Sequence, residues 1–223
     1  MDDAQPGPDQ TDVAASYDRL ADVYAQRIFD ELDGKPFDRT LLDRFADEVR
    51  GRGVVVDLGC GPGHVARYLH RRDVTVAGID LSPRMIGIAR RHMPEIDFRV
   101  GDLLALELAD ASAAGAVAFY SLIHFMPAEV ERALGEIARV LRPGAPLLVA
   151  VHRGSEPVHL DELWGVDVRL DFVFFEPEPL GAALRAAGFE VVEVLTRPFY
   201  RGVEAETERL YVWARRGERP RGP

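Results

Sequence analysis

The feature that most constrains this chain is a glycine-rich turn at residues 59–63, which directly follows an apolar run at residues 54–58. A helical pattern begins after the turn, so the segment has the order of a buried parallel strand, a tight turn and a helix N-terminus. Glycines allow positive φ angles and close approach of a ligand, and a helix N-terminus presents unpaired N–H groups at the positive end of its dipole. The segment therefore predicts a site for a nucleoside cofactor that carries an anionic group.

The spacing of the glycines distinguishes between cofactors. The dinucleotide fingerprint is G-x-G-x-x-G, whereas Gly59, Gly61 and Gly63 alternate here and Asp57 precedes them by two positions. The Asp57 carboxylate would repel a pyrophosphate and would suit a cationic ammonium or sulfonium group. The pattern D-x-G-x-G-x-G resembles the first motif of the class I S-adenosylmethionine-dependent methyltransferases. The resemblance implies that these four residues bind S-adenosylmethionine, which leaves as S-adenosylhomocysteine.

A second expected strand, residues 74–79, ends at Asp80. The distance from the glycine turn to Asp80 is about that at which nucleotide-binding folds place a carboxylate for the ribose hydroxyls. In the family, the matching segment also packs apolar side chains against adenine. By this resemblance Leu81 and Met85 contact the ring, although core packing explains Met85 equally well.

A third expected strand ends at Gly101-Asp102-Leu103. By resemblance, Asp102 accepts a hydrogen bond from the adenine amino group, and the backbone N–H groups of its neighbours contact the ring. An Asx-type turn without a ligand would have the same sequence. The position of this segment, after two strand ends that are expected to bind the cofactor, favours adenine recognition.

A loop with polar side chains follows the fourth expected strand, residues 115–119. The resemblance places this loop between cofactor and acceptor, so that Tyr120 and Ser121 flank the methionine part of the cofactor and His124 faces the acceptor. A hydroxyl acceptor needs its proton removed, and His124 and His152 are the candidate bases. For each histidine, a packed or surface side chain is the alternative.

Residues 11–32 have the pattern of a helix that carries Tyr17 and Tyr24 on one face. Family members with a similar Y-D-x-x-A-x-x-Y segment use this helix as part of a lid. By resemblance Tyr17 would take part in catalysis and Tyr24 would contact the cofactor. Packing of the stripe on the domain is a compatible alternative. We expect residues 11–50 to form a helical lid region whose second helix belongs to the core.

The segment 153–175 is expected to be an insertion after the fifth strand. Its first part lacks clean periodicity, and residues 168–175 alternate like an extended strand. Ligands of open α/β sheets bind beyond the carboxyl ends of the strands, where this segment begins. We therefore expect Arg153 and Trp164 to contact the acceptor, together with Tyr200 from the loop between the last two strands.

The alternation of strands and helices predicts an α/β fold with a doubly wound sheet. The resemblance, which extends over residues 12–215, implies a Rossmann-like seven-stranded sheet, mostly parallel, with helices on both faces and an antiparallel C-terminal strand. We expect one domain at residues 11–215. Residues 1–10 are expected to be a disordered tail, and residues 216–223 a flexible one.

The composition bears on partners and location. With 37 Asp and Glu against 27 Lys and Arg, the formal net charge is −10, which disfavours nucleic acid and anionic membranes. No apolar run reaches the ~18 residues that a membrane span needs. The single cysteine, Cys60, fits a reducing cytoplasm. No Cys/His cluster has metal-ligand spacing, so no metal is expected. His64, His70 and His92 are expected to be solvated on surface helices.

Together these patterns predict an enzyme that transfers the methyl group of S-adenosylmethionine to an O, N, S or C atom of a small molecule by in-line displacement. A monomer or homodimer is expected. Two alternatives stay open on the sequence: a protein that binds S-adenosylmethionine on the same fold without methyl transfer, and a methyltransferase that acts on protein or nucleic acid.

Overall fold

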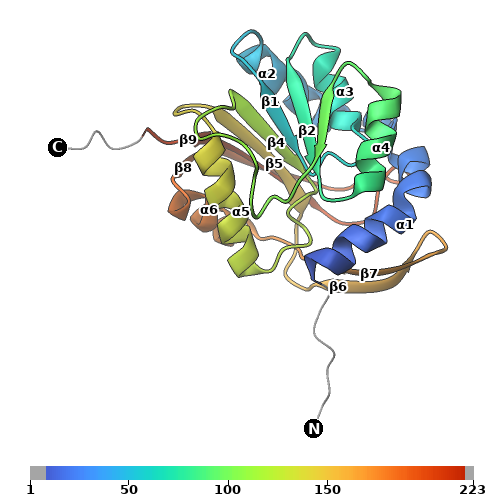
Figure 1. Cartoon of the computed structure of the whole chain (residues 1–223). Helices are drawn as coiled ribbons and strands as arrows, with labels where there is room; N and C mark the ends of the chain where they lie inside the picture. The colour runs from blue at the N-terminus through green and yellow to red at the C-terminus, as the bar shows by residue number, and fades with distance from the viewer. Residues whose placement is uncertain (1–8, 219–223) are drawn as a thin grey trace.

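A seven-stranded sheet with strand order β3-β2-β1-β4-β5-β9-β8 forms the centre of the molecule (Figure 1). The computed structural model describes residues 9–218. The strands are β1 (Val55–Leu58), β2 (Val76–Asp80), β3 (Asp97–Val100), β4 (Gly115–Phe119), β5 (Pro146–His152), β8 (Phe189–Arg197) and β9 (Arg209–Arg216). Strands β1 to β5 pair in parallel, and β9 is antiparallel to both β5 and β8. The predicted fold class is confirmed.

Helices cover both faces of the sheet. On one face lie α2 (Pro36–Val49), α3 (His64–His70) and α4 (Pro83–His92), and on the other lie α5 (Pro127–Val140) and α6 (Pro177–Ala186). Their apolar side chains recur at helical spacing and are buried against the strands, as Phe45 in α2 and Leu134 in α5 illustrate. The second helix of the N-terminal region therefore belongs to the core, as expected.

The N-terminal helix α1 (Gln10–Ile28) packs between α4 and a separate hairpin, β6 (Val158–Leu163) and β7 (Val166–Phe172) (Figure 1). The Asp9 side chain accepts hydrogen bonds from the backbone N–H groups of Thr11 and Asp12, which fixes the start of the helix. Gln10 is thus helical and does not belong to a tail. The rest of the expected N-terminal tail, residues 1–8, and most of the C-terminal one, residues 219–223, lie outside the described residues.

The hairpin is the one large element that the sequence did not reveal in full. Only the alternation of its second strand was evident, because β6 exposes most of its side chains and lacks an apolar face. The two strands join through Trp164 and Gly165, with φ angles of 53° and 78°. Positive φ at both central residues is what a tight type I′ turn requires, and glycine or asparagine usually provides it. A tryptophan in this conformation is an outlier.

Candidate functional site

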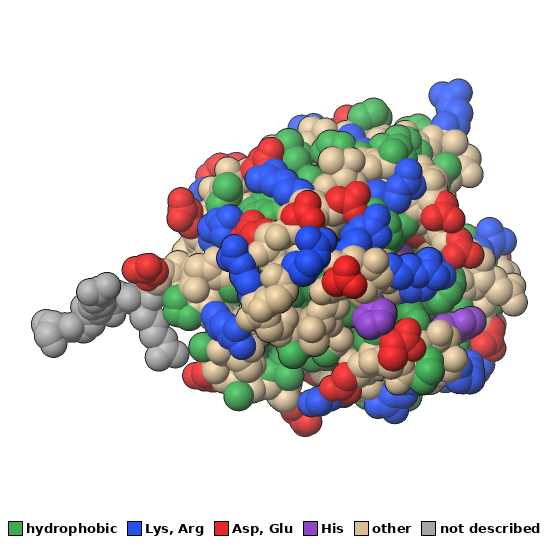
Figure 2. All heavy atoms as spheres, turned by 90° about the horizontal axis from the view of Figure 1, so that it is seen from above, with side chains coloured by type: hydrophobic (Ala, Val, Ile, Leu, Met, Phe, Trp, Pro, Cys, Tyr) green, Lys and Arg blue, Asp and Glu red, His purple; other side chains and the backbone are tan. Residues whose placement is uncertain are grey.

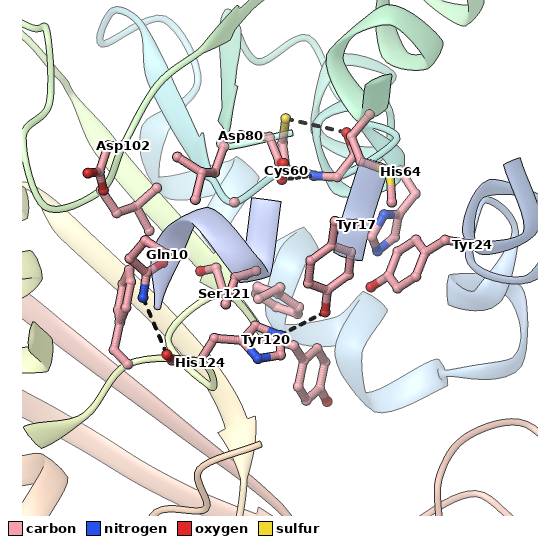
Figure 3. A pocket seen from close by; sticks show the side chains of 18 residues that line it. Gln10, Tyr17, Tyr24, Cys60, His64, Asp80, Asp102, Tyr120, Ser121 and His124 are labelled. Atoms are coloured by element: carbon pink, nitrogen blue, oxygen red, sulfur yellow. Dashed lines mark hydrogen bonds between the residues drawn. The ribbon is translucent and has the colours of Figure 1, made fainter. Parts of the chain in front are cut away.

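A cleft lies at the carboxyl ends of β1, β2, β3 and β4, under helix α1 (Figure 3). Most of the predicted cofactor residues line it, although they come from separate segments of the chain: Tyr24, Gly59, Gly61, Asp80, Leu81, Met85, Asp102, Leu103, Tyr120 and Ser121. The cavity has a volume of about 80 Å³. Ligand pockets commonly measure about 300–1,000 Å³, so the cleft is narrow in this conformation.

The glycine turn has the geometry that its sequence predicts. Gly59, Gly61 and Gly63 have φ angles of 68°, 52° and 86°. A Cβ atom on Gly59 would lie 2.3 Å from the Cβ atom of Ser121, and one on Gly63 would lie 2.7 Å from the Cε atom of Met93. Both the backbone conformation and the surrounding atoms therefore require glycine, and the backbone itself forms this wall of the cleft.

Asp57 occupies a different place from the one its predicted role suggests. Its side chain is buried and accepts a hydrogen bond of 2.9 Å from the backbone N–H of Ala66 in α3. Burial raises the pKa of Asp57 to about 7, although the hydrogen bond from Ala66 opposes the shift. Asp57 does not line the cleft, and neither do Gly63 and Gly101. Asp57 thus holds the first turn of α3 against the end of β1.

Asp80 lies on the surface of the cleft and orders its floor. One carboxylate oxygen accepts from the N–H of Gly61 at 2.7 Å, and the other accepts from the N–H of Ser82 at 2.9 Å. Burial raises the pKa of Asp80, and the two backbone hydrogen bonds oppose the shift. Asp102 also lines the cleft, and its side chain accepts from the N–H of Leu104, so the Asx-type turn forms there too.

His64, which we expected to be solvated, is buried and lines the cleft. Its position at the start of α3 places it against the 3-10 helix η1 (Glu31–Gly34), where its Nε2 atom lies 3.3 Å from Glu31. Burial alone would raise the pKa of Glu31, but hydrogen bonds from His64 and Lys35 lower it to about 2. His70 and His92 are exposed, as expected.

Three polar atoms of residues that line the cleft are buried without a hydrogen-bond partner. They are the Oγ atom of Ser121, the hydroxyl oxygen of Tyr120 and the Nδ1 atom of His64. Buried polar atoms are normally paired, so unpaired atoms beside a cavity indicate a place where a ligand can provide the partner. The sequence predicted a cofactor contact for Ser121 and Tyr120, and it did not predict one for His64.

Tyr17 and His124 form a hydrogen-bonded pair at one end of the cleft (Figure 3). The Tyr17 hydroxyl lies 2.8 Å from His124 Nε2, and His124 Nδ1 lies 2.8 Å from the carbonyl oxygen of Asp171 in β7. A carbonyl only accepts, so Nδ1 carries the hydrogen and Nε2 accepts the hydrogen bond from Tyr17. Burial lowers the pKa of His124 to about 4. His124 is therefore neutral at physiological pH, with its lone pair toward Tyr17.

His152, the other candidate base, has the opposite arrangement. Its Nδ1 atom lies 2.7 Å from the Thr207 hydroxyl and 3.1 Å from the Nη1 atom of Arg209. Arginine only donates, so Nδ1 of His152 is an acceptor and the ring hydrogen lies on Nε2. Burial and the nearby charges of Arg209 and Lys35 lower the pKa of His152 to about 3. The neutral ring therefore has an N–H group at Nε2 for a ligand.

A second, larger cavity of about 640 Å³ adjoins the cleft. Tyr17, Tyr24 and Tyr120 line both cavities and form the boundary between them. Tyr120 has a φ angle of 56°, an unusual conformation for an aromatic residue. The hairpin, α1 and the loop at residues 200–208 provide the other walls. Strained backbone at the meeting point of two cavities is typical of functional sites.

The three predicted acceptor residues have different surroundings. Trp164 lines the large cavity, and its ring lies 5.8 Å from that of Tyr24. Arg153 forms ion pairs of 3.2 Å with Glu176 and 2.9 Å with Glu208 and lines neither cavity. The Tyr200 hydroxyl accepts from the N–H of Phe37, and its side chain also lies outside both cavities. The structure thus brings only Trp164 to the expected place.

A buried group of charges at one end of the large cavity was not predicted. Lys35, the only lysine of the chain, pairs with Glu31 at 2.7 Å and with Glu204 at 3.5 Å, and Arg209 pairs with Glu204 at 3.2 Å. They come from two segments that are far apart in the sequence, residues 31–35 and residues 204–209. The burial of the sole lysine is visible only once the fold is known.

Comparisons with known proteins agree with this architecture. A methyltransferase-domain family profile matches residues 55–144. The O-methyltransferase cnsE of Penicillium expansum is 30% identical over 221 residues, which cover 87% of this chain and 77% of that protein. A malonyl-acyl-carrier-protein O-methyltransferase of Serratia marcescens is 31% identical over 110 residues, which cover 49% of this chain and 42% of that protein. The chain belongs to the class I S-adenosylmethionine-dependent methyltransferases.

Solved structures share the whole fold. DhpI in complex with SAH aligns with a TM-score of 0.73 at 22% identity, covering 94% of this chain and 98% of that one. The (4+2)-cyclase SpnF aligns with a TM-score of 0.71 at 22% identity, covering 95% and 98%. At this level of identity the likeness shows the fold alone.

Residues 9–218 provide no group of three or more His, Cys, Asp or Glu side chains arranged to hold a metal ion. Within the same residues, no helix combines the length and the apolar character that crossing a bilayer demands.

Proposed function

We propose that this chain transfers a methyl group from S-adenosylmethionine to a hydroxyl oxygen of a small molecule held in the large cavity. The observation that carries the proposal is the Tyr17–His124 pair at the boundary of the two cavities, where a neutral histidine has its lone pair toward a tyrosine hydroxyl. The family relationship supports S-adenosylmethionine as the cofactor.

The residues of the cleft fit this cofactor. The Asp80 carboxylate suits the ribose hydroxyls, and Leu81, Met85 and Asp102 suit adenine. The unpartnered Ser121 Oγ and His64 Nδ1 atoms can bind the polar end of the methionine part. Gly59 and Gly61 leave the backbone open to close approach. When bound, S-adenosylmethionine supplies an electrophilic methyl group.

Proton removal follows from the pair of side chains. Tyr17 reaches the large cavity and His124 does not, so the acceptor hydroxyl donates to the Tyr17 oxygen while Tyr17 donates to His124 Nε2. Methyl transfer would form the new C–O bond and break the methyl–sulfur bond of the cofactor, and the acceptor oxygen would then be strongly acidic. Its proton passes to Tyr17 and the Tyr17 proton passes to His124, whose Nδ1–H stays bound to the Asp171 carbonyl. A base with a pKa of about 4 is sufficient for this step.

We further propose that α1 and the β6–β7 hairpin act as a lid. The cleft measures only about 80 Å³ and α1 forms part of its wall, so entry of a cofactor requires α1 to move. Closure then excludes water from the reacting groups. In this proposal the moving unit comprises α1 and the hairpin, residues 158–172.

A small-molecule acceptor is supported by the shape and charge of the protein. The large cavity is lined by side chains on many sides, and the net charge is −10. Figure 2 shows basic and acidic side chains interspersed on the face in view, without a basic field that would suit nucleic acid. The cytoplasmic location, the absence of a metal requirement and the monomeric or homodimeric state stay predictions.

The test is a screen of phenols, alcohols and carboxylic acids with S-adenosylmethionine, in which mass spectrometry detects the gain of one methylene in the acceptor and release of S-adenosylhomocysteine. Transfer to an oxygen of a small molecule is expected. Transfer only to a protein or nucleic acid, or binding of S-adenosylhomocysteine with no transfer to any acceptor class, would contradict the proposal.

A further inference from the structure

The large cavity has aromatic walls. Six aromatic side chains line it, from α1, the loop after β4, the hairpin and the segment that follows it: Tyr17, Tyr24, Tyr120, Trp164, Phe172 and Phe174. Aromatic rings in such walls favour flat ring systems, through offset and edge-to-face contacts. The volume of about 640 Å³ is within the range of sites for drug-sized ligands.

The charges inside this cavity neutralise one another. The side chains of Lys35, Glu31, Glu204 and Arg209 are 4%, 11%, 3% and 2% exposed. Each of the two cations contacts a carboxylate, and Glu204 contacts both cations. An ionic acceptor would have to disrupt these pairs, and a buried ion without its partner costs several kcal/mol. The interior of the cavity therefore favours an uncharged ligand.

Arg27 does not change this balance inside the cavity. It is exposed at the edge of the cavity, and its guanidinium group lies 5.0 Å from the centre of the Trp164 ring. The Arg27 guanidinium therefore stacks on Trp164 at the rim of the cavity, and the pairs among the buried charges are unaffected.

His152 provides the polar contact within this aromatic cavity. Its Nδ1 atom is occupied by Thr207 and Arg209, which places the ring hydrogen on Nε2. Its ring lies 5.1 Å from that of Tyr120 and 5.6 Å from that of Phe174. His152 is thus held between two aromatic walls and can donate a hydrogen bond to a ligand oxygen.

We propose that the large cavity binds an uncharged, flat, multi-ring acceptor, and that His152 determines its position by donating the Nε2–H to a carbonyl or ether oxygen. This inference rests on the proposed function and adds the chemical class of the acceptor. It also separates the two histidines: His124 accepts the proton through Tyr17, and His152 recognises the acceptor without taking a proton.

The test uses Trp164 as the reporter. In the Trp213→Phe variant, Trp164 is the only tryptophan, and its fluorescence reports on ligands of the cavity. The protein, saturated with S-adenosylhomocysteine, is titrated with neutral 1-hydroxyanthraquinone and with charged anthraquinone-2-sulfonate. Calorimetric titration of the parent chain, which has both tryptophans, measures the affinities for the same two probes without the Trp213→Phe substitution.

The neutral probe is expected to quench the fluorescence and to reach saturation. The sulfonate should bind at least about tenfold more weakly, because burying its charge in this cavity is unfavourable. His152→Phe should weaken the neutral probe by about 3–10-fold, the value of one hydrogen bond between uncharged groups. His152→Gln, which retains a donor near the same place, should restore part of the loss. His70→Phe, on an exposed surface of α3, is the matched control and should bind like the parent.

Equal affinity for the two probes, or an unchanged affinity in His152→Phe, would overturn the inference. The S-adenosylhomocysteine affinity and the melting temperature of each variant are measured as well. A variant that keeps both has lost only the hydrogen bond to the probe, and a variant that loses both has lost the fold. If the acceptor screen detects methyl transfer to small polar or ionic hydroxyl compounds while the anthraquinones fail to bind, only the inference fails. If the anthraquinones bind but no acceptor is methylated, the proposed function fails.

Discussion

At the scale of single residues, hydrogen-bond partners give two histidines opposite roles. His124 donates to the Asp171 carbonyl and accepts from Tyr17, whereas His152 accepts from Arg209. The sequence identified both as candidate bases, because residue type and position after a strand were similar. It could not assign the tautomers, since these depend on partners that are 47 and 57 positions away from them in the chain.

Replacing His124 tests its role as the proton acceptor. His124→Asn should lower kcat by about 10²–10⁴-fold, the usual contribution of general base catalysis, with little change in the KM for S-adenosylmethionine. His152→Asn should mainly raise the KM for the acceptor. Steady-state kinetics with an acceptor from the screen makes the comparison. Equal effects of the two substitutions on kcat would contradict the assignment.

The low pKa of His124 also predicts a pH-dependent stability. Its pKa is 6.5 as a free group and about 4 in the fold, so between these values the unfolded chain binds the proton and the folded chain does not. The contribution of neutral His124 to stability is complete above pH 6.5 and decreases as the pH falls toward 4.

Urea unfolding at several pH values gives the free energies of unfolding of the parent and of His124→Asn. Their difference isolates the effect of His124, because the contributions of other titrating groups such as Asp57 cancel. The stability difference between the parent and His124→Asn should shrink by about 1.4 kcal/mol per pH unit as the pH decreases through that window. Ser155→Ala, at an exposed position without a titratable side chain, serves as the control and should show no such slope. A constant difference for His124→Asn would show that its pKa is not lowered.

At the scale of elements, α1 and the hairpin pack together. The Ser16 hydroxyl in α1 accepts from the N–H of Arg169 in β7 at 2.9 Å, and the Arg169 side chain pairs with Asp12 at 2.7 Å. The helix was predictable from its tyrosine spacing. Its partner was not, because β6 lacks an apolar alternation and the Trp164-Gly165 turn lacks the usual Asn-Gly sequence.

Hydrogen exchange tests the lid. Residues 12–28 and 158–172 should gain protection together when S-adenosylhomocysteine binds, because α1 and β7 share their contacts. Ser16→Ala removes the acceptor for the Arg169 N–H, at a cost of about 1–3 kcal/mol, and should lower protection of both segments. Ser155→Ala, at an exposed position, should not. Gain of protection in one segment alone would mean that the two move separately.

The turn conformation of Trp164 predicts a conflict between stability and function. Positive φ costs a bulky residue about 1–3 kcal/mol, and Asn-Gly is favoured in this turn. Trp164→Asn should therefore melt at a higher temperature than Trp164→Ala, by about 2–4 °C per kcal/mol, while both raise the acceptor KM more than the cofactor KM. Calorimetric melting and kinetics check both parts. A lower melting temperature for the Asn variant, or equal effects on the two KM values, would contradict this account.

At the scale of the whole molecule, the parallel sheet explains why distant segments form one cleft. The carboxyl ends of β1, β2, β3 and β4 meet at one edge, so side chains that follow four different strands line the same cavity. This is why the sequence predicted the sheet and most cofactor residues. The acceptor cavity combines α1, an inserted hairpin and the loop before β9, and no general rule predicts how these three segments contact one another. Two of the three residues predicted for the acceptor, Arg153 and Tyr200, therefore lie outside the cavity.

The central claim is that the cleft holds the cofactor and the adjoining cavity holds the acceptor, and calorimetric titration with S-adenosylhomocysteine tests it most directly. Asp80→Asn should weaken binding at least about tenfold, because charge-assisted hydrogen bonds contribute about 1.5–3 kcal/mol each. His152→Phe in the large cavity and Asp97→Asn at the exposed start of β3 should bind like the parent. An unchanged dissociation constant for a normally folded Asp80→Asn would contradict the account.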